Sequence, residues 1–394
     1  MTTNDLQPKA AGRAPLEIAL LAASAAAVLF SLISISLVQG FWFLALLVWA
    51  YLLIRKDILF SVPAFFWPLL LYVSLSLAAA AASIDRRASV KDSRDLLIVL
   101  LVPLVVAAFR RLSDLKFPLT ALFLSGTAAS VLAIIQFAGR ERPDQRIKGF
   151  MGHYMTQAGL LGLFIAFAMA QALFAKGKAR LAWTIILAPS GAALVMTLTR
   201  NAWLGVGAAA VLLLGLWNPK ALIVAPVLAV LLYFAGPEIV KSRVRSIFDR
   251  RDPSNIARIE YARAGLKIIG QKPIFGTGPD TVDELFQDPA YGLGDYARRS
   301  VHLHNNYLQI AAERGIPALA AWLAFLAVAG VHLLRRFRTG GPAIRPLAAG
   351  GLAALALLLV AGFFEYNFGD SEVAQLFLLL LALPFGPEAD EPSA

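Results

Sequence analysis

The sequence contains no cysteine, and only four of its 394 residues are histidines. The missing thiols exclude a disulfide bond, a thiolate nucleophile and a thiolate metal site. Gly276 and Gly278 do not form a nucleotide-binding loop, because no Gly-Lys-Ser/Thr follows them. We therefore expect no cofactor and no nucleotide partner, and ATP is not the expected energy source.

Charge is also scarce, and apolar residues take its place. Charged residues make up 15% of the chain and hydrophobic residues 59%, and the mean hydropathy is +0.69. These values are typical of a polytopic helical membrane protein. The net charge is +11. In a membrane protein, surplus basic residues more often determine the topology or bind anionic lipid groups than bind nucleic acid. We therefore expect no nucleic-acid partner.

Apolar runs of roughly membrane-spanning length divide the chain into three regions. Residues 1–236 are expected to hold nine transmembrane helices, residues 237–306 one large extramembrane loop with short helices, and residues 307–394 three more helices and a tail. The expected fold class is thus an all-α polytopic membrane protein with about twelve transmembrane helices. The runs are residues 16–37, 39–54, 58–82, 96–109, 117–139, 154–175, 181–198, 201–217, 220–236, 307–333, 344–364 and 371–385.

Basic residues in short loops predict the orientation. An even number of spans places both termini on one side, which the positive-inside rule makes cytoplasmic because that side holds Arg55, the lysine-rich loop 176–180 and the run 335–338. The opposite side breaks the rule, with four basic residues in 83–95 and four in 140–148. This excess suggests an anionic partner there; the alternative is an inverted topology.

The stretch from Val301 to Pro317 is the strongest candidate for chemistry, because polar clusters at the mouth of a membrane helix are costly. A neutral imidazole from His302 or His304 is a natural general base for a hydroxyl, with Asn305 to orient it. The alternative is a polar helix cap. The His-x-His spacing suits a metal, but only two further histidines exist, so no metal is expected.

Several arginines are candidates for binding an anion near this general base. Arg200 lies alone between two apolar runs, where it is either an interfacial anchor or a bidentate phosphate clamp. Arg258 and the basic loop 140–148 are expected to converge on the same anion. A leaving anion needs arginines and an attacking hydroxyl needs a base, so the residues favour group transfer from a lipid-linked phosphate.

Local sequence patterns predict helices and polar groups in the segments expected on the outer side of the membrane. Ser254 is the expected N-cap of a helix running to about Gly270, with Arg258 at the edge of its apolar face. Thr281 to Glu284 is typical of a capping box. The polar stretch Phe364 to Glu372 lies on the same side, with Glu365 among the groups expected to orient an acceptor. The apolar face is formed by Ile256, Ile259, Ala262, Leu266 and Ile269.

Three of these motifs resemble those of the O-antigen ligase and polymerase superfamily of bacterial envelope glycosyltransferases. Thr-Arg-x-x-Trp-Leu-Gly at 199–205 resembles its arginine motif, and Pro-Ile-Phe-Gly-Thr-Gly-Pro at 273–279 its glycine turn. His-Asn-x-Tyr-Leu-Gln from residue 304, followed by Glu-x-Gly from residue 313, resembles its histidine motif. The segments 149–156 and 364–372 look more like the ligase (WaaL-type) branch than the polymerase branch.

The resemblance implies a GT-C-like fold and transfer of O-antigen from undecaprenyl pyrophosphate to lipid A–core at the periplasmic face of the inner membrane. The reaction would be inverting and independent of metal and ATP, among membrane lipids. It implies that His304 is the base and that Arg200 and Arg258 bind the pyrophosphate. Since His302 is a second candidate base, the choice stays open, with His304 preferred for its neighbour Asn305. Substrate-binding roles are expected for His302, Asn305, Tyr307, Arg142, Arg146, Lys148 and His153.

Two other functions remain open from the sequence. An O-antigen polymerase or a protein O-oligosaccharyltransferase would use the same donor and differ only in the acceptor. A lipid-linked glycan transporter would also need a basic cavity, but transporters usually contain internal repeats, and none is evident in this sequence.

Overall fold

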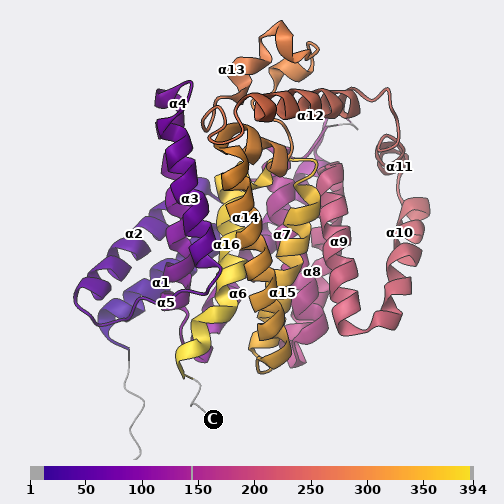
Figure 1. The fold of residues 1–394 in the computed structure, drawn as a ribbon. Coiled ribbons are helices and arrows are strands. Elements are labelled where there is room, and N and C mark those ends of the chain that lie inside the picture. Colours follow the sequence, from indigo (N-terminus) through magenta and orange to yellow (C-terminus); the bar gives the residue numbers. More distant parts are fainter. Residues whose placement is uncertain (1–12, 143–144, 391–394) are drawn as a thin grey trace, which may run out of the picture.

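The computed structural model describes residues 13–142 and 145–390, and every regular element in those ranges is a helix. Seven helices are long and apolar enough to cross a membrane, and three shorter apolar helices accompany them. The expectation of an all-α polytopic membrane protein is confirmed (Figure 1). The α-helices are α1 Pro15–Phe30, α2 Ile35–Ile54, α3 Phe66–Ala81, α4 Arg86–Asp92, α5 Leu101–Ala108, α6 Lys116–Ala138, α7 Tyr154–Phe174, α8 Gly177–Met196, α9 Arg200–Trp217, α10 Val224–Ala235, α11 Glu238–Arg245, α12 Pro253–Gln271, α13 Val282–Phe286, α14 Asn306–Thr339, α15 Ile344–Ala361 and α16 Ser371–Ala382.

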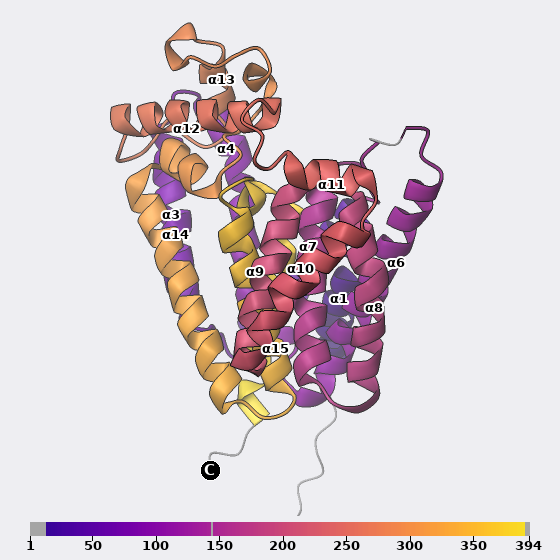
Figure 2. The ribbon, with the colours of Figure 1, turned by 90° about the vertical axis from the view of Figure 1, so that its right-hand side faces the viewer.

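Short 3-10 helices connect several of these elements. The expected span 96–109 begins as a 3-10 helix, η1, and continues as α5, while the expected span 220–236 contains η3 and the short helix α10 at the margin of the bundle (Figure 2). The first two spans meet around Ser34, whose hydroxyl accepts a hydrogen bond from the first turn of α2, so α2 begins earlier than predicted. The 3-10 helices are η1 Ser93–Leu100, η2 Leu112–Leu115, η3 Pro219–Ile223, η4 Pro289–Tyr291, η5 Ala297–Arg299, η6 Asn367–Gly369 and η7 Leu383–Asp390.

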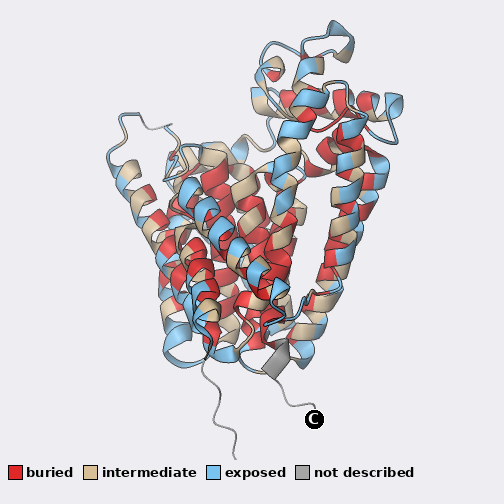
Figure 3. Cartoon of the chain, turned by 90° about the vertical axis from the view of Figure 1, so that its left-hand side faces the viewer, coloured by how far each residue is buried: buried red, intermediate tan, exposed pale blue. Residues whose placement is uncertain are grey.

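Helices α7 and α15 form the centre of the bundle. In each, 78% of the most apolar window is buried, against 28% in α2, α8 and α9. Figure 3 shows the buried residues concentrated in the interior of the bundle. Both helices are rich in alanine and glycine, which lets neighbouring backbones approach closely without a hydrophobic driving force. The outer helices instead expose apolar side chains of the kind that face lipid.

One end of the bundle carries the short polar helices α4, α11, α12 and α13 (Figure 1). We call it the α12 end. The basic loops 83–95 and 140–142 lie at this end too, whereas α1 begins and η7 ends at the opposite end (Figures 1 and 2). The α12 end therefore gathers the surplus basic residues noted in the sequence.

Helix α12 lies across this end, roughly perpendicular to the bundle (Figures 1 and 2). Its N-cap is Asp252, whose carboxylate accepts from the backbone N–H groups of Ser254 and Asn255, so the prediction of Ser254 as the cap is wrong. The helix ends at Gln271, close to the expected position.

The predicted apolar face of α12 is also wrong. Ile256, Ile259 and Leu266 are 43%, 54% and 63% exposed. The buried residues lie on another face, because α12 packs mainly through small side chains and one tyrosine against the start of α14. That face consists of Ala257, Tyr261, Ala264, Gly265 and Ile268.

The turn 273–279 fixes α12 to α14. The N–H groups of Thr277 and Gly278 donate to the carbonyls of Ala312 and Glu313, both at 2.9 Å, and Ile316 N–H donates to Pro273 O at 2.8 Å. These bonds satisfy the backbone where α14 breaks around residue 315. The expected capping box at 281–284 is not formed, because the Thr281 hydroxyl donates to Gly278 O at 2.6 Å instead.

Two glycines make this junction possible. Gly276 and Gly315 both have positive φ, of 63° and 85°. A Cβ on Gly276 would lie 2.4 Å from the main chain of Glu313, and one on Gly315 would lie 1.9 Å from Ile274 O. Any other residue at either position would push the turn away from α14.

We predict that Gly276→Ala lowers the free energy of unfolding by about 3 kcal/mol, through positive φ and steric overlap. Gly270→Ala is the control, because Gly270 lies within α12 and a Cβ there meets nothing within 4 Å. It should be neutral, or stabilising by about 0.5–1 kcal/mol. Thermal melts of the purified variants measure both effects. Equal melting temperatures for Gly276→Ala and wild type would show that the turn does not hold α12 on α14.

Candidate active site

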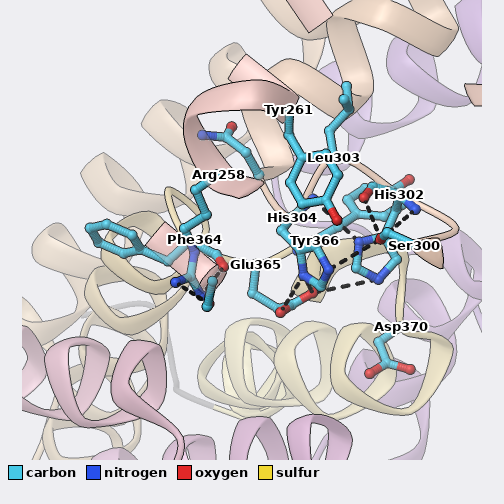
Figure 4. A network of polar contacts seen from close by, with 12 residues as sticks. Arg258, Tyr261, Ser300, His302, Leu303, His304, Phe364, Glu365, Tyr366 and Asp370 are labelled. Carbon is cyan, nitrogen blue, oxygen red and sulfur yellow. Dashed lines mark hydrogen bonds and ion pairs between the residues drawn. The ribbon is translucent and has the colours of Figure 1, made fainter. Parts of the chain in front are cut away.

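A buried carboxylate between two imidazoles forms the centre of the α12 end (Figure 4). Glu365, in the connection between α15 and α16, is 4% exposed. Its carboxylate oxygens lie 2.9 and 3.1 Å from Nδ1 of His304, and Oε1 lies 3.6 Å from Nε2 of His302. The structure thus brings together residues 61 positions apart in the chain.

Local hydrogen bonds shape the loop that carries both histidines. The Asn305 side chain caps α14 by accepting from Leu308 N–H at 2.9 Å, and Leu303 N–H donates to Gln309 Oε1 at 2.7 Å. His304 adopts φ +48°, an uncommon conformation for a residue with a side chain. Backbone strain of this kind persists only where the surroundings enforce it, and it is frequent at functional sites.

These contacts orient both rings. Nδ1 of His304 donates to Glu365, and Nε2 lies 3.2 Å from the Ser300 hydroxyl, which itself donates to His302 O at 2.8 Å. Nδ1 of His302 accepts from the backbone N–H of His304 at 3.3 Å. In a neutral His304 ring whose Nδ1 proton is held by Glu365, Nε2 is the nitrogen that can accept a proton. This arrangement suits a general base.

Burial and charge determine the protonation states. Burial by itself would raise the pKa of Glu365, but the electrostatic interaction and hydrogen bond with His304, together with His302, bring that pKa down to about 2. Burial lowers the pKa of His302 to about 4, against the opposing attraction of Glu365. At neutral pH Glu365 is an anion and His302 is a neutral ring.

His302, His304 and Glu365 are also a possible metal-ligand set, since one ligand atom from each lies within 4.8 Å of the others. Two imidazoles and one carboxylate are ligands that several divalent metals accept. A metal bound through Nδ1 of His304 would replace that ring's hydrogen bond to Glu365. The absence of a metal stays a prediction from the sequence.

Arg200 opens α9 and reaches the segment between α11 and α12. Its guanidinium donates to the Ser246 hydroxyl at 2.8 Å and to Asn255 Oδ1 at 3.2 Å, and it lies 3.5 Å from Asp252 Oδ1. The side chain is 10% exposed. Arg200 is thus turned inward toward polar groups, which does not fit a purely interfacial anchor.

Arg258, on α12, points toward the chain at Phe364 (Figure 4). It donates to the Ser254 hydroxyl at 3.0 Å and to Phe364 O at 3.3 Å, and its buried Nε has no hydrogen-bond partner among the described residues. Burial, and next the charge of Arg200, lower the pKa of Arg258 from its usual value. Asp252 is the one carboxylate in ion-pair contact with either guanidinium in the described part of the chain. The surplus positive charge favours a bound anion such as phosphate.

The other residues expected to bind substrate lie at various distances from this centre. Asn305 also donates to Phe363 O at 3.1 Å. The Tyr307 hydroxyl donates to Leu359 O at 2.7 Å. The exposed His153 is close enough to contribute to the lowered pKa of His302. In the basic loop, Arg146 stacks on Tyr154, with 4.4 Å from its guanidinium carbon to the ring centre. Arg142 and Lys148 are exposed.

Sequence reasoning assigned Glu365 a different role and missed three contributors. Glu365 was expected to orient an acceptor, whereas it binds both imidazoles. Ser300 holds the histidine loop, Tyr261 lies with its ring centre 5.5 Å from that of His304, and Asp252 faces Arg200. The signal available for Glu365 was an isolated acid in an otherwise aromatic loop, but its partner was not readable from spacing.

Residues 185–323 match the family model described as O-antigen ligase. This match, over about a third of the chain, is consistent with a member of the O-antigen ligase and polymerase superfamily. Among curated proteins it has no significant match. The matched segment runs from α8 into α14 and contains Arg200, Arg258 and both histidines of the site, whereas Glu365 lies outside it.

The lowered pKa of His302 gives a stability prediction. Between pH 6.5 and about 4, the unfolded state binds a proton at this residue that the native state does not, so stability falls as pH falls through this window. Glu365 contributes in a lower window, because its stabilisation is complete above about pH 4.5 and lost toward pH 2.

The variant His302→Asn removes the protonation of residue 302 between pH 6.5 and about 4, and its side-chain oxygen can still accept a hydrogen bond from His304 N–H. Its melting temperature should decline less than that of wild type between pH 6.5 and 4.5, by roughly 2–4 °C. His332→Asn, at the far end of α14, is the matched control and should follow wild type. Parallel curves for all three proteins would contradict a neutral, buried His302.

Proposed function

We propose that this protein transfers O-antigen polysaccharide from undecaprenyl pyrophosphate to lipid A–core, completing lipopolysaccharide. The observation that carries the proposal is the pairing of two inward-turned guanidiniums with an imidazole whose Nε2 is free to accept a proton. The superfamily match supports the general class of lipid-linked glycan transfer.

The reaction is a single displacement. Nε2 of His304 removes the proton from an acceptor hydroxyl, whose oxygen forms a bond to the anomeric carbon of the donor sugar. The bond from that carbon to the pyrophosphate oxygen breaks, and undecaprenyl pyrophosphate leaves with the bonding electrons. Arg200 and Arg258 stabilise the leaving anion, and the configuration at the anomeric carbon is inverted. The step uses neither ATP nor a metal.

Glu365 supports the base in two ways. Its carboxylate holds the Nδ1 proton and so keeps Nε2 in the accepting form, and it stabilises the imidazolium formed during transfer. His302 stays neutral, fixes the loop through its bond from His304 N–H, and borders the substrate. Asn305, Tyr307, His153, Arg142, Arg146 and Lys148 are proposed to contact substrate around this centre.

We place the α12 end in the periplasm and both termini in the cytoplasm of a bacterial inner membrane. The basic residues at the opposite end, including Arg55 and Arg335–Arg338, support this orientation. Residues 237–306 then form the periplasmic loop domain between two membrane regions, 1–236 and 307–394. A polymerase or protein O-oligosaccharyltransferase would share the site and differ in acceptor. A transporter fits less well, because the polar groups gather at one end.

Transfer from undecaprenyl-pyrophosphate-linked O-antigen to lipid A–core by the purified, reconstituted protein tests the proposal. Labelled lipopolysaccharide is the expected product. No product with lipid A–core, but extension of a second lipid-linked glycan or modification of a protein, would replace the ligase assignment by one of the two related activities.

Arg258→Lys should lower kcat/KM by about 10²-fold, because a lysine ammonium cannot present the forked donors of arginine to a phosphate. Arg263→Lys is the control, since Arg263 is an exposed residue of the same helix, and should remain within about twofold of wild type. Arg200→Lys should behave like Arg258→Lys. Normal transfer by both site variants would show that these arginines only hold α12 in place.

Glu365→Gln should reduce kcat by on the order of 10² to 10⁴, because an amide that donates to Nδ1 forces the proton onto Nε2. Glu284→Gln, an exposed acid on α13, should retain full activity. A folded Glu365→Gln protein with wild-type kcat would mean that the carboxylate does not set the tautomer of His304.

A further inference from the structure

A group of acidic residues lies on the side of the imidazoles away from the arginines. In Figure 4, Arg258 and Phe364 lie on one side of Glu365, and His302 and Asp370 on the other. Beyond them, Asp92 ends α4 and Asp95 lies in η1. The site therefore has a basic flank and an acidic flank, with the candidate base between them.

The acidic flank contains a cleft between α3, η1, α14 and α16. Together with its opening to solvent, the cleft contains about 570 Å³ of space. Polar and aromatic groups line it beside the apolar side chains of the surrounding helices. The polar and tyrosine residues are Tyr72, Asp92, Asp95, Arg314, Tyr366 and Ser371.

The charge of this cleft does not suit a phosphate. Its one lining cation, Arg314, is buried and paired with Asp92 and Glu313, both at 2.9 Å. Arg314 also donates to the Tyr366 hydroxyl at 3.0 Å. Asp95 is exposed and has no ion-pair partner among the residues the structure describes. The lining is therefore neutral to acidic.

The same lining suits a sugar. A free carboxylate accepts hydrogen bonds from hydroxyl or amino groups, and the half-buried rings of Tyr366 and Phe368 offer apolar surface for a pyranose face. The buried Nε of Arg314 has no hydrogen-bond partner in the described chain. The lining thus offers acceptors, hydroxyls and aromatic rings together, as a sugar ring requires.

The cleft also adjoins the base. Tyr366 belongs to its lining, donates its N–H to Glu365 Oε1 at 3.1 Å, and has its ring centre 6.1 Å from that of His302. In an inverting displacement, the attacking hydroxyl and the leaving group occupy opposite sides of the anomeric carbon. With the leaving group on the arginine flank, the hydroxyl must enter from the acidic flank.

Resting on the function proposed above, we infer that this cleft binds the acceptor sugar, a neutral or amino-bearing hexose, with Asp95 accepting hydrogen bonds from it. The lipid-linked donor occupies the arginine flank. Acceptor choice would then be determined by the residues of η1 and by the connection between α15 and α16.

The absence of native cysteine allows a direct binding test. Asp95→Cys is labelled with a water-soluble maleimide, alone, with lipid A–core, and with undecaprenyl-pyrophosphate-linked O-antigen. Lipid A–core should slow labelling at least fivefold, and the donor should leave it unchanged. Glu284→Cys, on the exposed surface of α13, should react at one rate in all three conditions. Protection by the donor alone, or by neither molecule, would overturn the inference.

Kinetics with Asp95→Asn give a second readout. The KM for lipid A–core should rise about tenfold, while the KM for the donor and kcat stay within about twofold, and Glu284→Gln should match wild type. A change in donor KM, or none in acceptor KM, would contradict the assignment. If wild type transfers nothing to lipid A–core, the proposed function fails, whereas the labelling pattern still decides whether the cleft binds this glycan.

Discussion

The buried carboxylate of Glu365 is the constraint on which the α12 end depends. An ionised carboxylate removed from water must be compensated by nearby donors or positive charge. Here the donors are the His304 imidazole and the N–H of Tyr366, with the His302 ring 3.6 Å away. Asn306 ties the same segments together, because its N–H donates to Gly362 O and its side chain accepts from Phe368 N–H. The histidine loop and the α15–α16 connection are therefore fixed to each other.

The second organising feature is the uneven distribution of charge around that carboxylate. Arg200 pairs with Asp252, and Arg258 has no ion-pair partner among the described residues, whereas Arg314, on the other side, is fully matched by Asp92 and Glu313. Unmatched positive charge attracts an anion, and a matched or acidic surface does not. Under the proposed function, a pyrophosphate-bearing donor and a neutral or amino-bearing acceptor sugar would be separated by charge before either reaches the base.

The helical membrane fold and the positions of the polar motifs could be predicted from the sequence. Hydropathy, and rare polar residues at the ends of apolar runs, are strong local signals. It misplaced the buried face of α12, since Ala257, Ala264 and Gly265 carry little hydropathy and become informative only once the helix packs on α14. It could not pair Glu365 with His304, because that contact depends on how α14 and α15 pack. Arg200 and Arg258 were expected to share an anion, and both lie within reach of the same segment of α12, although their joint role stays a proposal.

The central claim is that His304, oriented by Glu365, is the base. The most direct measurement is single-turnover transfer by purified His304→Ala and His302→Ala, each confirmed as folded by its thermal melt, with donor bound in excess of KM. We expect His304→Ala to lose transfer by at least 10³-fold while still binding donor, and His302→Ala to retain measurable turnover. Near-wild-type transfer by a folded His304→Ala protein, with loss confined to His302→Ala, would contradict the account and make His302 the base.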